Sequence, residues 1–240
     1  MPELPAPLPP GERTVGQVVA ETIRAYGANF WRVLPLGVPL AIVDQLSVRQ
    51  AAGAQMYVYW AATPLFAAAY MRACTILHDA KPTRTALGVA ILVYLPFPAL
   101  RAFFILPGIA WFALIGLAVP AAMVERLGFR EALVRGRRLG QADYAHSLGS
   151  LAALVLVVGV ADSTLGALLR SQGDNGQRAA VFVADLVLSP MLFLGGALLY
   201  LDQAARVGSR GPQRRSSRDA DLHPPVDLDA AGRPDAQVES

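Results

Sequence analysis

Two long apolar runs in the middle of the chain constrain its fold more than any other feature. They occupy residues 87–106 and 109–124 and are joined at Pro107-Gly108. Both are too long and too apolar for the core of an ordinary small domain, whereas the Arg-rich segment from Glu125 is too charged to enter lipid. The junction near Glu125 therefore predicts a membrane surface, and the chain is predicted to be an integral membrane protein.

The composition supports a membrane environment. Hydrophobic residues make up 54% of the 240 residues and charged residues 16%, against about 25% charged residues in typical soluble domains. The basic residues stand beside apolar runs rather than on one soluble face, so they do not favour a nucleic-acid partner. Cys74 is the only cysteine, which excludes an intrachain disulfide, and the histidines lack the spacing of a metal site. No cofactor or metal is predicted.

The apolar runs predict an all-α polytopic membrane bundle with six transmembrane helices. The predicted spans are residues 31–48, 56–77, 87–106, 109–124, 144–169 and 179–201. Two amphipathic helices, beginning at Thr14 and at Glu125, are predicted to lie in the membrane interface. The first begins with Thr14 and Gln17, which fit a capping box.

The two ends of the chain lack the apolar pattern. Residues 1–13 are rich in proline, and residues 206–240 contain hardly any large apolar side chain, so both segments are predicted to be disordered. The membrane domain is therefore predicted to occupy residues 14–205.

The distribution of arginine and lysine predicts the orientation of the spans. With six spans, one side of the membrane holds Arg13, Arg24, Arg32, Arg72, Lys81, Arg84, Arg126, Arg130, Arg135, Arg137, Arg138, Arg206, Arg210, Arg214, Arg215 and Arg218. The other side holds Arg49, Arg101, Arg170 and Arg178. Because cytoplasmic loops carry the excess of basic residues, both termini are predicted to lie in the cytoplasm.

The segment from Glu125 to Gly140 is a candidate for contact with lipid headgroups. Arg130, Arg137 and Arg138 are displaced from its apolar face, where they would meet anionic lipids. The alternative is that these arginines only set the topology of the chain.

Ionisable residues inside the spans form a second candidate site. Asp162 and Asp185 stand at similar distances from the centre of the turn at residues 171–177, so they are expected at similar depth. Arg101 is the expected counter-charge, and Asp44 is a further acid towards the same side. Three hypotheses remain open for this cluster: structural pairing, a transport or proton pathway, and an intramembrane aspartyl hydrolase.

The middle of the chain resembles a bacterial membrane-domain family. The similar residues are the Pro107-Gly108 turn, Pro120, Glu125 and the helix that carries Arg135. The family is the membrane anchor of membrane-bound glycerophosphoryl diester phosphodiesterases, and it includes stand-alone six-span proteins. Two departures are Arg126, where the family usually has Gly, and Gly136, where it usually has Ser. The resemblance implies a multi-span bundle of a bacterial cytoplasmic membrane that lacks the catalytic phosphodiesterase domain.

The expected function is therefore non-enzymatic. Transport, lipid handling and a scaffold role in the membrane are the hypotheses, and a protein partner or a second copy of the chain is a further expectation. The alternative is an intramembrane enzyme that uses Asp162 and Asp185.

Overall fold

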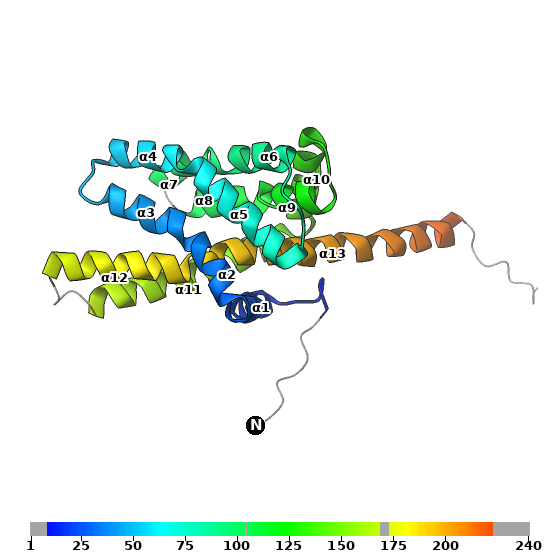
Figure 1. The fold of residues 1–240 in the computed structure, drawn as a ribbon. Helices are drawn as coiled ribbons and strands as arrows, with labels where there is room; N and C mark the ends of the chain where they lie inside the picture. Colours follow the sequence, from blue (N-terminus) through cyan, green and yellow to red (C-terminus); the bar gives the residue numbers. More distant parts are fainter. Residues whose placement is uncertain (1–8, 104, 169–172, 223–240) are drawn as a thin grey trace, which may run out of the picture.

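The computed structural model describes residues 9–103, 105–168 and 173–222, and every regular element in these ranges is a helix. The all-α prediction is thus confirmed for the described chain (Figure 1). The elements are α1 (Val15–Ala28), α2 (Phe30–Val33), the 3-10 helix η1 (Leu34–Gly37), α3 (Val38–Ser47), α4 (Ala52–Ala61), α5 (Thr63–His78), α6 (Arg84–Tyr94), α7 (Phe97–Phe103), α8 (Ile105–Ile115), α9 (Ala118–Val124), α10 (Phe129–Ala142), α11 (Tyr144–Leu168), α12 (Gly173–Leu188) and α13 (Pro190–Leu222).

Three helical segments are long and apolar enough to cross a membrane. They are Ile105–Val124, Tyr144–Leu168 and Asn175–Gly208, and they coincide with the last three predicted spans. Arg84–Leu100 is a shorter apolar segment within the third predicted span. The first two predicted spans consist of shorter helices joined end to end.

Proline explains why most predicted spans are divided. Pro39, Pro64 and Pro190 lie in the first turns of α3, α5 and α13. A proline lacks the N–H that a helix interior needs, but it fits the first turn, where that N–H has no intrahelical partner. α11 contains no proline and runs unbroken for 25 residues.

The sequence predicts a break at Pro107-Gly108, but the structure places both residues inside α8, which begins at Ile105. Pro107 occupies the third helical position, where no backbone hydrogen bond is lost. Gly108 is buried, and a Cβ built there would lie 3.0 Å from the ring of Phe97. The glycine therefore permits close packing of α7 on α8, while the chain bends later, at Gly116.

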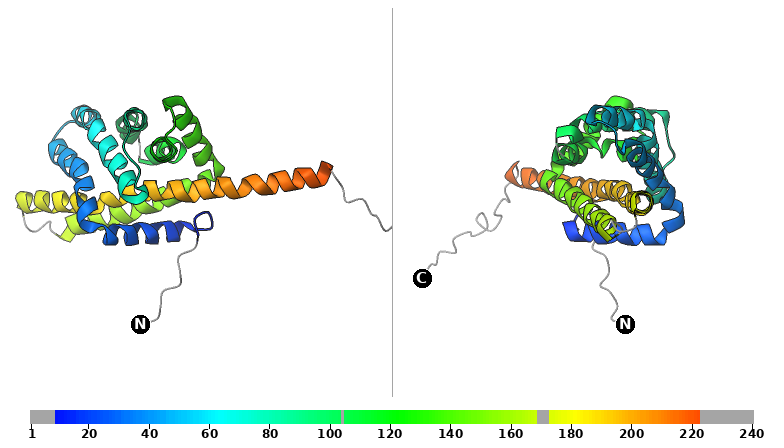
Figure 2. Two further views of the ribbon diagram at one scale, coloured as in Figure 1. Left: turned by 45° about the vertical axis from the view of Figure 1, so that its right-hand side comes forward. Right: turned by 90° about the vertical axis from the view of Figure 1, so that its left-hand side faces the viewer.

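The helices are arranged as an elongated bundle around α13. Figures 1 and 2 show α11, α12 and α13 on one side of the bundle and α3 to α9 on the other. α1 crosses α11 and α13, and α10 is steeply inclined to α13 near the end where the chain enters α11 (Figure 1). The α5–α6 and α9–α10 connections lie at that end, whereas the α3–α4 connection lies at the opposite one.

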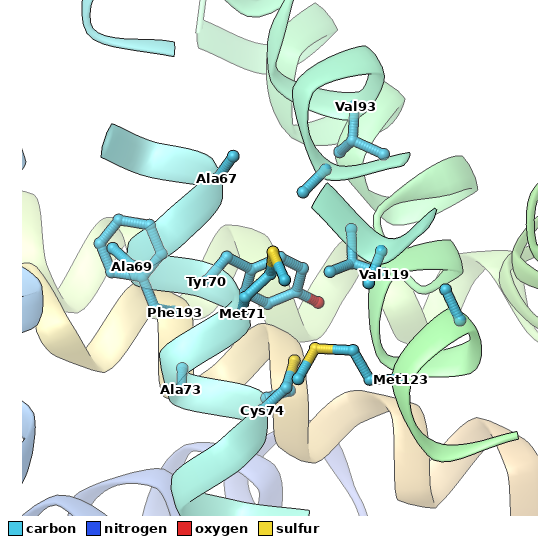
Figure 3. Packing of buried hydrophobic residues seen from close by; sticks show 14 of the residues in the cluster. Ala67, Ala69, Tyr70, Met71, Ala73, Cys74, Val93, Val119, Met123 and Phe193 are labelled. Atoms are coloured by element: carbon cyan, nitrogen blue, oxygen red, sulfur yellow. The ribbon is translucent and has the colours of Figure 1, made fainter. Parts of the chain in front are cut away.

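The core is built from small residues around one buried tyrosine. Tyr70 on α5 is fully buried and points toward Val119 of α9, whereas Phe193 of α13 lies beside Ala69 (Figure 3). Cys74, one turn further along α5, is also fully buried, as the sequence predicts. Alanines at many contact positions allow these helices to approach closely, which is typical of packing in membranes.

The outer surface of α11 is apolar. Leu156, Val160 and Leu168 are 66%, 57% and 71% exposed. Such a continuous apolar face is unfavourable in water but suits hydrocarbon, so α11 is the helix whose surface most clearly fits contact with lipid.

The structure confirms the predicted start of α1. Thr14 N–H donates to Gln17 Oε1 at 2.7 Å, and Gln17 N–H donates to Thr14 Oγ1 at 3.4 Å. Part of the apolar face of α1 packs on protein, since Val18 is buried and Val15 contacts α11 beside Gly149. The interfacial placement of α1 stays a prediction.

The apolar face of α10 packs against protein, not against lipid as predicted. Ala132 is fully buried, and a Cβ built on Gly136 would lie 2.4 Å from the backbone N of Ala118. A Cβ on Gly140 would lie 2.5 Å from the carbonyl oxygen of Leu114. Two glycines four residues apart thus bring α10 into backbone contact with the α8–α9 bend, as in other small-residue helix interfaces.

The predicted disordered tail begins at residue 206, whereas α13 continues as a helix to Leu222. Residues 223–240 of that tail and residues 1–8 of the predicted N-terminal segment lie outside the described residues.

Replacing Gly136 with Ala should destabilise the bundle, because the new methyl group overlaps the backbone of Ala118. We expect the free energy of unfolding in detergent to fall by about 2 kcal/mol. Gly159→Ala on α11 is the matched control, since nothing lies within 4 Å of its added Cβ. It should be neutral or slightly stabilising. Equal thermal midpoints for the two variants would contradict the close contact.

Candidate functional site

The structure describes three members of the predicted intramembrane cluster. Asp44 lies on α3, Asp162 on α11 and Asp185 on α12. Arg101 belongs to α7, but its side chain lies outside the described residues. Tyr59 on α4 donates its hydroxyl hydrogen bond to Asp44 at 2.5 Å. Asp162 lies within range of the charge of Asp44.

The structure does not place Asp162 and Asp185 at the same depth. Asp162 lies six residues before the end of α11, and Asp185 lies twelve residues after the start of α12. At 1.5 Å per residue, the two differ by roughly 9 Å along a hairpin of antiparallel helices. The sequence estimate took the centre of the turn within residues 171–177, but α12 already begins at Gly173. The predicted pairing of Asp162 with Asp185 stays a prediction.

Backbone contact between α3 and α12 explains the position of Asp185. A Cβ built on Gly37 would lie 2.2 Å from the carbonyl oxygen of Leu186, and Gln45 Nε2 donates to the carbonyl oxygen of Arg178 at 2.9 Å. The two helices thus run antiparallel in close contact, and Asp185 is buried at this interface.

Two residues of the family resemblance, Glu125 and Arg135, meet at the bend between α9 and α10. Arg135 Nε donates to both oxygens of Glu125, at 2.9 and 3.0 Å, and the Tyr200 hydroxyl donates to Glu125 Oε1 at 2.9 Å. Glu125 thereby joins the end of α9 to α10 and α13. Pro120 is buried in the first turn of α9, which leads into this bend.

Arg126, which replaces the usual glycine of that family, has a left-handed backbone with φ of 52°. This position directly follows the C-cap of α9. Glycine is preferred in such a position because a Cβ makes the left-handed conformation roughly 1–2 kcal/mol less favourable. Arginine therefore occupies this position at a cost in stability.

A buried ionic network at the same end of the bundle was not predicted from the sequence. Arg206 Nε donates to Asp202 Oδ2 at 2.9 Å, and its Nη1 donates to Asp143 Oδ2 at 3.0 Å. Arg206 Nη2 donates to the carbonyl oxygen of Arg13 at 2.8 Å. Asp202 is fully buried, contacts His146 Nε2 at 3.0 Å and accepts the Gly11 N–H at 2.8 Å. The network joins the start of α1 and the α10–α11 corner to α13.

His78 at the end of α5 contacts the carbonyl oxygen of Ala197 through Nε2, at 3.0 Å. Within the described ranges, no group of three or more His, Cys, Asp or Glu side chains is placed to hold a metal ion.

A pocket of about 360 Å³ opens between the α5–α6 and α9–α10 connections. The lining residues are Lys81, Thr83, Thr85, Ala122, Arg126 and Leu127. The two connections are more than 40 residues apart in the sequence, so no local motif could reveal the pocket. The lining thus combines two cationic side chains and two hydroxyl side chains with the apolar side chains of Ala122 and Leu127.

Comparisons of the chain with protein-family models, with curated proteins and with solved structures find no match.

Replacing Arg206 with Gln should leave the buried carboxylate of Asp202 without its main counter-charge. We expect a loss of about 3 kcal/mol in the free energy of unfolding. Adding Asp202→Asn to the Arg206→Gln variant should cost less than the sum of the single changes, because the two side chains share one interaction. Thermal unfolding in detergent measures both effects.

Arg138→Gln, on the exposed face of α10, is the control and should change the free energy of unfolding by less than about 0.5 kcal/mol. Strict additivity of the two changes would refute the coupling.

Proposed function

We propose that the chain is a non-enzymatic lipid-handling module that crosses a bacterial cytoplasmic membrane six times, with both termini in the cytoplasm. The proposed spans are α2 to α3, α4 to α5, α6 to α7, α8 to α9, α11, and α12 with the first part of α13. Pairs of short helices then replace single long ones where proline interrupts the chain.

The arrangement of the connections supports this topology. The α5–α6 and α9–α10 connections, which carry Lys81 and Arg126, lie at the same end as the entry into α11 (Figure 1). Arg49, after α3, and Arg178, on α12, belong to the opposite end, where Gln45 joins the two helices. This is the segregation of basic residues that the positive-inside rule describes.

The exposed face of α10 is the observation that carries the lipid-handling proposal. Its glycine face packs on the α8–α9 bend, which leaves Arg130, Arg137 and Arg138 exposed on the other side. None of the three forms an ion pair with another residue in the described part of the chain. Three unpaired guanidinium groups at a cytoplasmic membrane surface attract anionic headgroups, each by about 1 kcal/mol.

Membership in the phosphodiesterase membrane-domain family is part of this proposal. The Glu125–Arg135 pair supports it, because the resembling residues have a common structural role at the α9–α10 bend. The enzyme alternative has less support, since the separation in depth between Asp162 and Asp185 does not suit a catalytic pair of carboxylates. In this proposal the carboxylates on α3, α11 and α12 fix the register of their helices.

The lipid composition around the protein tests the proposal. The chain is extracted in polymer-bounded lipid particles, and its ratio of anionic to zwitterionic lipid is compared with that of the whole membrane. We expect anionic lipid to be enriched, and a triple variant with Gln at positions 130, 137 and 138 should reduce the enrichment by at least about threefold.

The matched control places Lys at the same three positions, which keeps the charge and should keep the enrichment. A wild-type chain with the lipid composition of the whole membrane would disprove lipid handling. So would a Gln variant that enriches anionic lipid as strongly as the wild type.

A further inference from the structure

The pocket between the α5–α6 and α9–α10 connections has the chemistry of an anion site. Lys81 and Arg126 line it from opposite connections, and within the described chain neither is paired with a carboxylate. The hydroxyl groups of Thr83 and Thr85 lie on the same wall. Thr83 Oγ1 accepts the Ala86 N–H at 3.0 Å, so its own hydrogen is oriented away from that bond and can be donated to a ligand.

Two acids near this pocket are engaged elsewhere, and Asp79 of the α5–α6 connection is not among the residues that line it. Glu125, which precedes Arg126, is held by Arg135 and Tyr200. Glu131 Oε2 accepts the Gly128 N–H at 3.1 Å at the start of α10. Neither carboxylate neutralises the pocket, whose charge therefore favours an anionic occupant.

Arg126 lines the pocket from the position that directly follows the C-cap of α9, where its backbone is left-handed. Replacing it with glycine therefore removes the charge and relieves the backbone in one change.

Exposed apolar residues stand on the two helices that follow the connections, α6 and α10. Leu87 and Phe129 are 39% and 43% exposed, and Phe129 packs over Gly88 of α6. Leu87 follows Thr83 by four residues and therefore shares its helix face. Cations and hydroxyl groups beside exposed apolar side chains match a phosphate headgroup with acyl chains attached.

We propose that this pocket binds the phosphate of one anionic phospholipid, with Lys81 and Arg126 as its counter-charges. The inference rests on the proposed cytoplasmic position of the two connections and adds a discrete site to the diffuse attraction of α10. The phosphate oxygens accept hydrogen bonds from Lys81, Arg126, Thr83 and Thr85, while the acyl chains lie along Leu87 and Phe129.

The test titrates the detergent-solubilised full chain with short-chain phosphatidylglycerol and follows one-to-one binding by native mass spectrometry. We expect Lys81→Gln and Arg126→Gly each to weaken binding about fivefold. Arg126→Gly should also raise the thermal midpoint by a few degrees, because it relieves the left-handed backbone. Binding that falls while stability rises cannot be caused by misfolding.

Arg130→Gln removes the same charge from a neighbouring exposed position and is the matched control. Its affinity for one lipid should stay within twofold of the wild-type value. Any effect of Arg130→Gln on lipid enrichment tests the lipid-handling role proposed for α10, not this pocket. Wild-type binding by the Arg126→Gly variant, or an equal loss in Arg130→Gln, would overturn the proposal. Displacement of the lipid by inorganic phosphate at equal concentration would also overturn it, since the site would then be one for free phosphate.

Discussion

The apolar surface of α11 is the constraint on which the architecture depends. α11 has 25 residues and turns Leu156, Val160 and Leu168 outward. In water, each exposed methyl group would raise the free energy of the folded chain. Contact with hydrocarbon removes that cost, but a backbone or ionic group without a partner is strongly unfavourable there. The bundle is consistent with both requirements, since the 25-residue apolar helix α11 faces outward and the ion pairs of Glu125 and Arg206 lie at one end.

Close contact between helices in this bundle depends on glycine and alanine. In a membrane, lipid competes with protein for apolar side chains, so helices gain from close backbone approach more than from large residues. Gly37 against α12 and Gly136 against the α8–α9 bend are two such contacts. A side chain at either glycine would overlap the neighbouring backbone, whereas a Cβ built on Gly159 of α11 would have no neighbour within 4 Å.

Much of the fold was predictable because composition and helix signals are local. The all-α class, the cap at Thr14 and the buried Cys74 follow from residues close in the sequence. The α8 start at Ile105 was not predictable, because proline and glycine permit either a turn or a helix start, and packing of Phe97 on Gly108 favours the helix. The partners of Arg206 and the pocket could not be predicted, since their residues come from distant segments.

The geometry of the candidate site also could not be predicted from local sequence. Asp44, Asp162 and Asp185 are recognisable as costly residues in apolar runs, but their mutual distances depend on where each helix begins. A shift of a few residues in the α11–α12 turn changes the relative depth expected for Asp162 and Asp185. At the α9–α10 bend the resembling residues Glu125 and Arg135 proved to be bonded, which position in the sequence alone does not show.

The most direct measurement of the central claim is the location of two reporters in living bacteria, one fused after Ser240 and one inserted after Ala51. A six-span chain with cytoplasmic termini predicts a fluorescent, phosphatase-inactive reporter after Ser240 and an active periplasmic phosphatase after Ala51. Phosphatase activity after Ser240, or both reporters in one compartment, would contradict the account.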